Sequence, residues 1–193
     1  MSTKIDPAVI QMFAENVRAQ VLPKPGTIKL DASIVQKIAQ RVPVFAGMSP
    51  DCLMTTLATA ENYPVKAGEA VFKEGDIGSA FYVVIAGEVI VQKYKDGETV
   101  ELARLGTGQC FGEMALVQND VRTATVVAIG DSTTMRFERE RIEAIPESAH
   151  IIYRNIARIL ASRLDESSVM LAELMVQQKS QSGPMPLDGN IDI

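Results

Sequence analysis

The sequence has little positive charge. Its 193 residues include 19 Lys and Arg against 24 Asp and Glu, which leaves a formal net charge of -5, and no segment gathers basic residues into a block. Proteins that bind DNA neutralise many phosphates with such residues. We therefore expect no nucleic acid among the partners of this chain.

Cysteine, histidine and long apolar runs are also scarce. Cys52 and Cys110 are the only cysteines and lie outside any C-x-x-C spacing, and His150 is the only histidine. This pattern predicts neither a disulfide framework nor a metal site. No run approaches the roughly 18 apolar residues of a membrane span, and residues 1–21 lack the basic start and apolar run of a signal peptide. We expect a cytoplasmic protein without membrane association.

The first part of the sequence favours helices. Residues 1–30 hold a predicted amphipathic helix over 1–21, followed by a linker rich in proline and glycine; the apolar positions of that helix are Ile5, Val9, Phe13 and Val17. A region over 31–147 follows and opens with two short helices. Asp31 is suited to cap the first, and Ser49, with proline after it, to cap a second that ends near Ala60.

The rest of the 31–147 region alternates short β-favouring runs with glycine. Such regular strands and turns are typical of an antiparallel sandwich or barrel, and Lys95-Asp96-Gly97 is a strong hairpin turn. The predicted strands are Val71-Phe72, Phe81–Ile85, Val89–Tyr94, Thr99–Leu105, Ala124–Ile129 and Thr133–Phe137.

A long helix is predicted over 148–178, after a break at Pro146. One face of it repeats at spacings of 4, 3, 4, 3 and 4 residues, as in the seam of a coiled coil, so it calls for a partner helix; the seam residues are Leu160, Leu164, Ser167, Leu171, Leu174 and Gln178. The tail over 179–193 is rich in Ser, Gly, Pro and Gln, and we expect it to be disordered.

One segment carries the residues for ligand chemistry. Gly112 and Ala115 are small enough to let a ligand approach the backbone at the start of a short helix, where free N–H groups bind anions. Arg122 adds a planar cationic donor suited to phosphate. Glu113 would repel a phosphate and is better suited to sugar hydroxyls. Phosphate and sugar together indicate a nucleotide; the alternative is a buried Glu113–Arg122 ion pair that only closes the loop.

This segment resembles the phosphate-binding cassette of the cyclic nucleotide-binding domain family. The resemblance rests on Gly112–Leu116 and Arg122–Thr125 and extends over about residues 40–178. It implies an α+β, mainly β fold: an antiparallel β-roll (a double-stranded β-helix or jelly-roll-like barrel) flanked by N-terminal helices and a long C-terminal helix. It also implies how the ligand is held. Arg122 contacts the cyclic phosphate, Glu113 accepts from the ribose 2′-hydroxyl, the backbone near Met114 and Ala115 donates to phosphate, and Thr123 reaches the phosphate or the base.

The long helix is similar to the dimer helix of bacterial catabolite activator proteins. By that match Ser167, and Ser168 from the partner subunit, contact the adenine, with Arg163 beside them, and the helix forms a homodimer. The alternative is that both serines are tolerated interruptions of the seam. The activators continue into a DNA-binding helix-turn-helix domain, and we expect no such domain in this protein.

The expected function is a stand-alone, non-catalytic receptor for a cyclic nucleotide. We expect cAMP as the ligand, with no metal, and a signal passed to a separate effector protein by placement of the C-terminal helix. The sequence shows no arrangement of a nucleophile with a base that would suggest an enzyme. Thr123 leaves cGMP open as the ligand, and a scaffold that no longer binds, or a regulatory subunit of a separate enzyme, also remain open.

Overall fold

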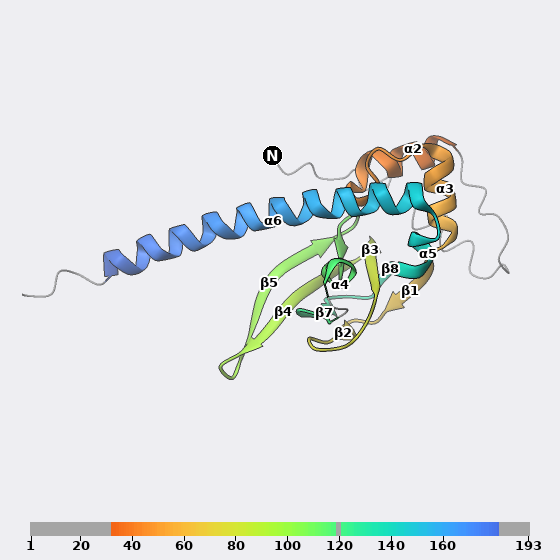
Figure 1. The fold of residues 1–193 in the computed structure, drawn as a ribbon. Helices are drawn as coiled ribbons and strands as arrows, with labels where there is room; N and C mark the ends of the chain where they lie inside the picture. Colours follow the sequence, from red (N-terminus) through yellow and green to blue (C-terminus); the bar gives the residue numbers. More distant parts are fainter. Residues whose placement is uncertain (1–31, 119–120, 182–193) are drawn as a thin grey trace, which may run out of the picture. The chain divides into compact units, whose positions relative to one another are not determined.

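The computed structural model describes residues 32–118 and 121–181 (Figure 1). The predicted N-terminal helix, the linker and most of the tail lie outside these residues. In chain order the described elements are α2 (Ala32–Arg41), the 3-10 helix η1 (Pro43–Phe45), α3 (Pro50–Ala58), β1 (Glu61–Val65), β2 (Ala70–Phe72), β3 (Ala80–Ala86), β4 (Glu88–Lys95), β5 (Glu98–Gly106), β6 (Cys110–Phe111), α4 (Met114–Val117), β7 (Thr125–Ala128), β8 (Ser132–Glu138), α5 (Arg139–Glu143) and α6 (Pro146–Gln181).

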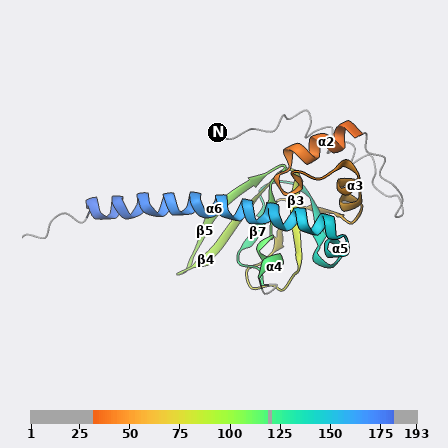
Figure 2. The same cartoon turned by 45° about the horizontal axis from the view of Figure 1, so that its top comes forward.

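The described strands form two antiparallel four-stranded sheets. One has the order β1-β8-β3-β6 and the other β2-β7-β4-β5. Each sheet therefore combines strands from distant parts of the sequence, as a β-roll requires, and the short helices lie outside the sheets (Figure 2). The α+β, mainly β fold with its antiparallel β-roll is confirmed, and each strand predicted above overlaps an observed one.

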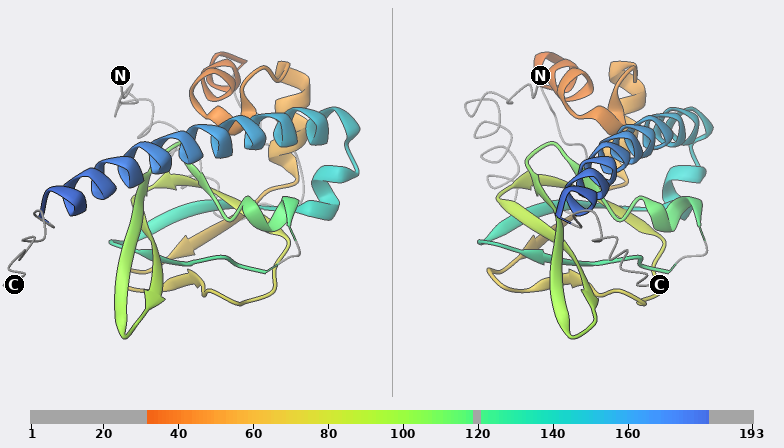
Figure 3. Two further views of the ribbon diagram at one scale, coloured as in Figure 1. Left: turned by 60° about the vertical axis from the view of Figure 1, so that its left-hand side comes forward. Right: turned by 90° about the vertical axis from the view of Figure 1, so that its left-hand side faces the viewer.

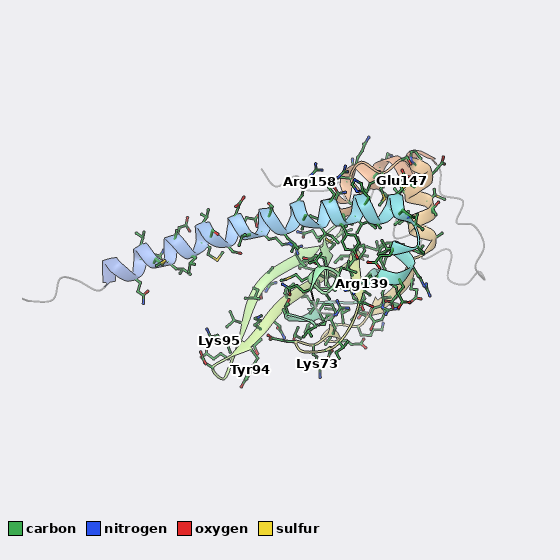
Figure 4. All side chains as sticks on the ribbon, in the orientation of Figure 1. Lys73, Tyr94, Lys95, Arg139, Glu147 and Arg158 are labelled. Carbon is green, nitrogen blue, oxygen red and sulfur yellow. The ribbon has the colours of Figure 1, made fainter. Side chains whose placement is uncertain are left out.

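The hairpin between β4 and β5 forms as the sequence predicts. Asp96 and Gly97 both have positive φ, at 53° and 90°, which is the conformation of a two-residue turn that matches the twist of the strands. Tyr94 and Lys95 lie beside this turn (Figure 4), and β4 and β5 run out from the sheet as one long ribbon (Figure 3).

The core lies between the two sheets and under the helices. Six of the seven residues of β3 are buried, because this strand has a neighbour on each side and is covered on both faces. Phe81 stacks on Phe137 of β8, with ring centroids 4.9 Å apart, and Tyr82 stacks on Phe111 at 5.2 Å. These aromatic pairs anchor the strand from which the site is built.

The helices before the sheets are fixed by caps and by a buried polar contact. The hydroxyl of Ser49 accepts from the backbone N–H of Cys52 at 3.2 Å, so the predicted cap of α3 is confirmed. Within α3, Thr56 is completely buried. Its hydroxyl donates to the carbonyl of Cys52 at 2.8 Å and lies 2.7 Å from the hydroxyl of Ser148, which ties α3 to the first turn of α6.

The helix α6 begins earlier and ends later than predicted. Pro146 is its first residue, where a missing N–H and a fixed φ suit a helix, so the proline starts the helix and does not precede it. The described residues divide into two compact units after Ile156, and the domain boundary proposed at 148 remains a prediction. Among the described residues, no helix combines the length and apolarity that a membrane crossing needs.

Candidate functional site

Arg122 occupies the loop between α4 and β7, and its backbone is fixed on both sides. Its N–H donates to the carbonyl of Asp76 at 2.8 Å, and its carbonyl accepts from the N–H of Gly75 at 2.9 Å. The turn before β3 therefore holds the backbone of the arginine in place. A side chain anchored in this way presents its charge at a defined point.

The side chain of Arg122 is buried and its orientation is set by three groups. Only 5% of the residue is exposed. Nη1 donates to the carbonyls of Ala80, at 2.7 Å, and Gly112, at 3.0 Å. The guanidinium carbon lies 4.2 Å from the centre of the Phe72 ring, a distance at which the ring face attracts a cation. Arg122 is therefore positioned by neutral groups.

No carboxylate within the described residues forms a salt bridge with Arg122. The predicted alternative of a Glu113–Arg122 ion pair is therefore not what these two residues form. Burial lowers the pKa of Arg122, because a charge is less stable away from water. Buried charges in proteins are normally compensated by an opposite charge. This arrangement fits an anionic ligand.

The residues before α4 bring a carboxylate next to this arginine loop. Gly112 has φ of 74°, which favours glycine, and a Cβ there would lie 2.9 Å from Nη1 of Arg122. Glu113 follows as the N-cap residue of α4 and is 2% exposed. The expected short helix, Met114–Val117, is confirmed and appears as the short green helix in Figure 3.

The structure also brings together the remaining cassette residues named from the sequence. The hydroxyl of Thr123 lies 3.4 Å from the sulfur of Met114, so these two side chains meet beside the arginine loop. Ala115 is buried, and its carbonyl accepts from Nη2 of Arg139.

Sequence reasoning missed Arg139. This residue is the first of α5 (Figure 4), and its side chain reaches across 24 positions of the sequence to Ala115. Its position two residues after the predicted strand Thr133–Phe137 is the only local signal, and such a signal does not identify the carbonyl that the side chain reaches.

The three residues proposed on the long helix lie in the second unit. Arg163, Ser167 and Ser168 follow Ile156 on α6. Each serine hydroxyl donates to the carbonyl four residues earlier, at 2.8 Å, and is exposed. Serines commonly satisfy themselves in this way inside helices, and these bonds can exchange for a ligand without leaving a buried group unpaired. Their contact with a base remains a prediction.

Candidate metal ligands do not cluster. Within residues 32–118 and 121–181, His, Cys, Asp and Glu form no group of three that could hold a metal ion. Cys52 and Cys110 are buried and are not joined in a disulfide. Buried cysteines often behave as small hydrophobic residues.

Known proteins are similar to this chain in sequence and in fold. The model of the cyclic nucleotide-binding domain matches residues 64–148. A cyclic AMP receptor protein of Thermus thermophilus is 31% identical over 137 residues, which are 70% of this chain and 63% of that protein. This chain thus covers less than two thirds of that relative.

Solved structures agree with the sequence match. The catabolite activator protein of Thermus thermophilus aligns with a TM-score of 0.63 and 32% identity over 69% of this chain and 63% of that one. The regulatory domain of Toxoplasma gondii PKA, crystallised with cAMP, aligns with a TM-score of 0.57 and 26% identity over 63% of this chain and 47% of that one. Residues 64–148, which contain the buried arginine and its loop, therefore match the cyclic nucleotide-binding domain family.

Proposed function

We propose that this chain is a receptor for a cyclic nucleotide, with cAMP as its ligand. The observation that carries the proposal is the buried guanidinium of Arg122, which neutral carbonyls and an aromatic face hold in place. A buried cation without a salt-bridge partner among the described residues is stabilised by an anion beside it, and a phosphate supplies one. The relatives named as cAMP-binding proteins support cAMP as the first ligand to test.

Each cassette residue has a role in this proposal. Arg122 donates to the cyclic phosphate through nitrogens other than Nη1. Glu113 accepts from the ribose 2′-hydroxyl, and the N–H groups of Met114 and Ala115, which have no partner within the first turn of their helix, donate to a phosphate oxygen. Thr123 lies next to the arginine and is free to exchange its weak contact with sulfur for a bond to the ligand. These roles are binding roles, and we propose no catalytic residue.

The signal in this proposal leaves through α6. The nucleotide favours one placement of the helix by differential contacts, and a separate effector protein responds to that placement. The apolar seam residues Leu164, Leu171 and Leu174 are more than half exposed. We propose that they pair with the same helix of a second copy, and that Arg163, Ser167 and the partner's Ser168 then contact the base.

Calorimetric titration of the purified protein with cAMP and with cGMP tests the ligand assignment. We expect saturable cAMP binding, recovery of the nucleotide unhydrolysed, and a loss of binding in Arg122→Leu on the order of 2–5 kcal/mol, as for a buried charge that loses its partner. Arg141→Leu, on the exposed surface of α5, is the matched control.

Three results would change this assignment. No binding of either nucleotide at millimolar concentration would refute the receptor and favour a scaffold. An affinity for cGMP more than tenfold above that for cAMP would make cGMP the ligand, as Thr123 allows. Conversion of the nucleotide to its open monophosphate would replace the receptor by an enzyme.

A further inference from the structure

Gly78 lies in the turn before β3 (Ala80–Ala86), and its backbone does not explain why it is a glycine. Several other glycines of the described region have positive φ, including Gly75 and Gly112. Gly78 is not among them, so an L-residue could adopt its backbone conformation without strain. The reason for glycine must therefore lie in the space around it.

That space is filled by the guanidinium of Arg122. A Cβ on residue 78 would lie 2.9 Å from Nη2, 3.2 Å from Nε and 3.4 Å from Cζ. An atom stacked over the face of the guanidinium would be nearest to the central carbon. This Cβ is nearer to the two nitrogens, so it would stand in front of the edge that Nε and Nη2 form.

The same edge is the one that remains for a ligand. Nη1 already donates to the carbonyls of Ala80 and Gly112, and it has two hydrogens to give. Nε and Nη2 donate in parallel, in the geometry that matches two oxygens of a phosphate or one oxygen between them. A methyl group in front of this edge would compete for the position of a ligand oxygen.

We propose that Gly78 is a positioning residue of the anion site, whose missing side chain keeps the Nε–Nη2 edge of Arg122 open to a phosphate oxygen. The inference rests on the proposed nucleotide-binding function and adds the edge of the arginine that the ligand uses. It also gives Gly112 and Gly78 different roles. The carbonyl of Gly112 accepts from Nη1 of Arg122, and Gly78 leaves the space in front of Nε and Nη2 open.

The experiment is a comparison of Gly78→Ala with Gly130→Ala by calorimetry with cAMP. Gly130 is a matched control, because its φ is not positive and a Cβ there would meet nothing within 4 Å. We expect Gly78→Ala to weaken cAMP binding by about tenfold, the scale of one charge-assisted hydrogen bond, and Gly130→Ala to leave it unchanged. In an Arg122→Lys background, which has no such edge, Gly78→Ala should cause no further loss.

Two results would overturn the proposal. One is cAMP affinity unchanged in Gly78→Ala, with or without a loss of stability, since that is what a merely structural glycine gives. The other is an equal loss of affinity in the Arg122→Lys background. If Gly78→Ala does not fold, the double variant Gly78→Ala/Arg122→Ala is expected to fold, because it removes the guanidinium that the new methyl group would contact. A double variant that also does not fold would overturn the proposal.

A second measurement separates this inference from the proposed function. The NMR signal of the Arg122 Nε–H in the ligand-free protein should shift in Gly78→Ala and not in Gly130→Ala. If the wild-type protein binds no cyclic nucleotide, the receptor proposal fails, while this signal still tests whether residue 78 controls the edge of the arginine. An unchanged signal in Gly78→Ala refutes the inference on its own.

Discussion

Arg139, the first residue of α5, donates through Nη2 to the carbonyl of Ala115 in α4. Its own backbone N–H donates to the carbonyl of Ser79 at 3.1 Å, immediately before β3. One residue therefore connects the cassette helix, the central strand β3 and the helix that follows β8. A change in the position of α4 would be transmitted to α5 through this arginine.

Arg139→Ala is expected to weaken cAMP binding by loosening α4. A hydrogen bond from a charged donor contributes on the order of 1 kcal/mol or more, so we expect Kd to rise about fivefold. Calorimetry measures the change. Arg141→Ala is the control, because this arginine lies on the same helix but donates to Thr59 at the surface. Equal effects of the two substitutions would contradict a specific link between Arg139 and α4.

Arg122→Lys is expected to weaken cAMP binding almost as much as Arg122→Leu. Lysine keeps the charge but cannot donate to the carbonyls of Ala80 and Gly112 while it offers two parallel donors to phosphate. We expect a rise in Kd of about a hundredfold, within the range for a buried charge pair. Binding is measured by calorimetry and the fold by circular dichroism. Near-wild-type affinity would mean that charge alone, and not the fork geometry, holds the ligand.

Leu171→Glu is expected to shift the protein from dimer to monomer. Leu171 lies on the heptad seam of α6, and a buried unpaired charge in such a seam opposes association. Val169→Glu is the matched control, because Val169 is equally exposed, at 60% against 59%, but lies off the seam. Sedimentation velocity with and without cAMP gives the mass. Equal effects of both variants, or a wild-type monomer at all concentrations, would refute the proposed pairing.

Thr56→Val is expected to destabilise the fold by about 1–3 kcal/mol, because it leaves the buried hydroxyl of Ser148 without its hydrogen bond to Thr56. Urea denaturation measures the change. Adding Ser148→Ala to Thr56→Val removes both hydroxyls together, so the double variant should lose less than the sum of the single losses. Strictly additive losses would show that the contact between the two hydroxyls contributes nothing.

Tyr153 is expected to make stability fall at high pH. Burial, together with the hydrogen bond to Glu143 at 2.6 Å, raises the pKa of Tyr153 from 10.0 to about 12. Between these values the unfolded chain loses the proton and the folded protein keeps it, so the contribution is complete below pH 10 and is lost as pH rises towards 12. Urea denaturation of wild type and Tyr153→Phe at several pH values should give a stability difference that narrows through this window. If the difference in unfolding free energy between wild type and Tyr153→Phe stays constant over this pH range, Tyr153 does not cause the loss of stability.

The sequence predicts the elements of this fold where the local signals are strong. The turn at Asp96 and Gly97, the cap at Ser49 and the cassette around Arg122 all depend on residues close together in the chain. The prediction missed β1, because Glu61–Val65 contains Asn62 and Pro64, which seldom occur in strands. The structure places β1 at the edge of its sheet, where a proline is tolerated.

The parts of the site that could not be predicted are contacts across long stretches of sequence. Gly78 is 44 positions from Arg122 in the sequence, and only the folded chain brings the two together. Gly78 belongs to no motif named above and does not have a positive φ. Arg139 is in the same situation with respect to Ala115. Two-residue strands such as β6 are similarly invisible, because their only evidence is the ladder that they form with β3.

The order in which the strands are made differs from the order in which they lie in the sheets. The last two, β7 and β8, each lie between two strands made earlier, β2 and β4 in one sheet and β1 and β3 in the other. While the ribosome is still adding these residues, the earlier strands have unpaired edges that could join another chain. Arg122 lies just before β7, so the arginine of the proposed site is synthesised at the stage at which the sheets close. The cell would therefore meet this protein as a fragment with open sheet edges, prone to aggregate, until residue 138 has emerged.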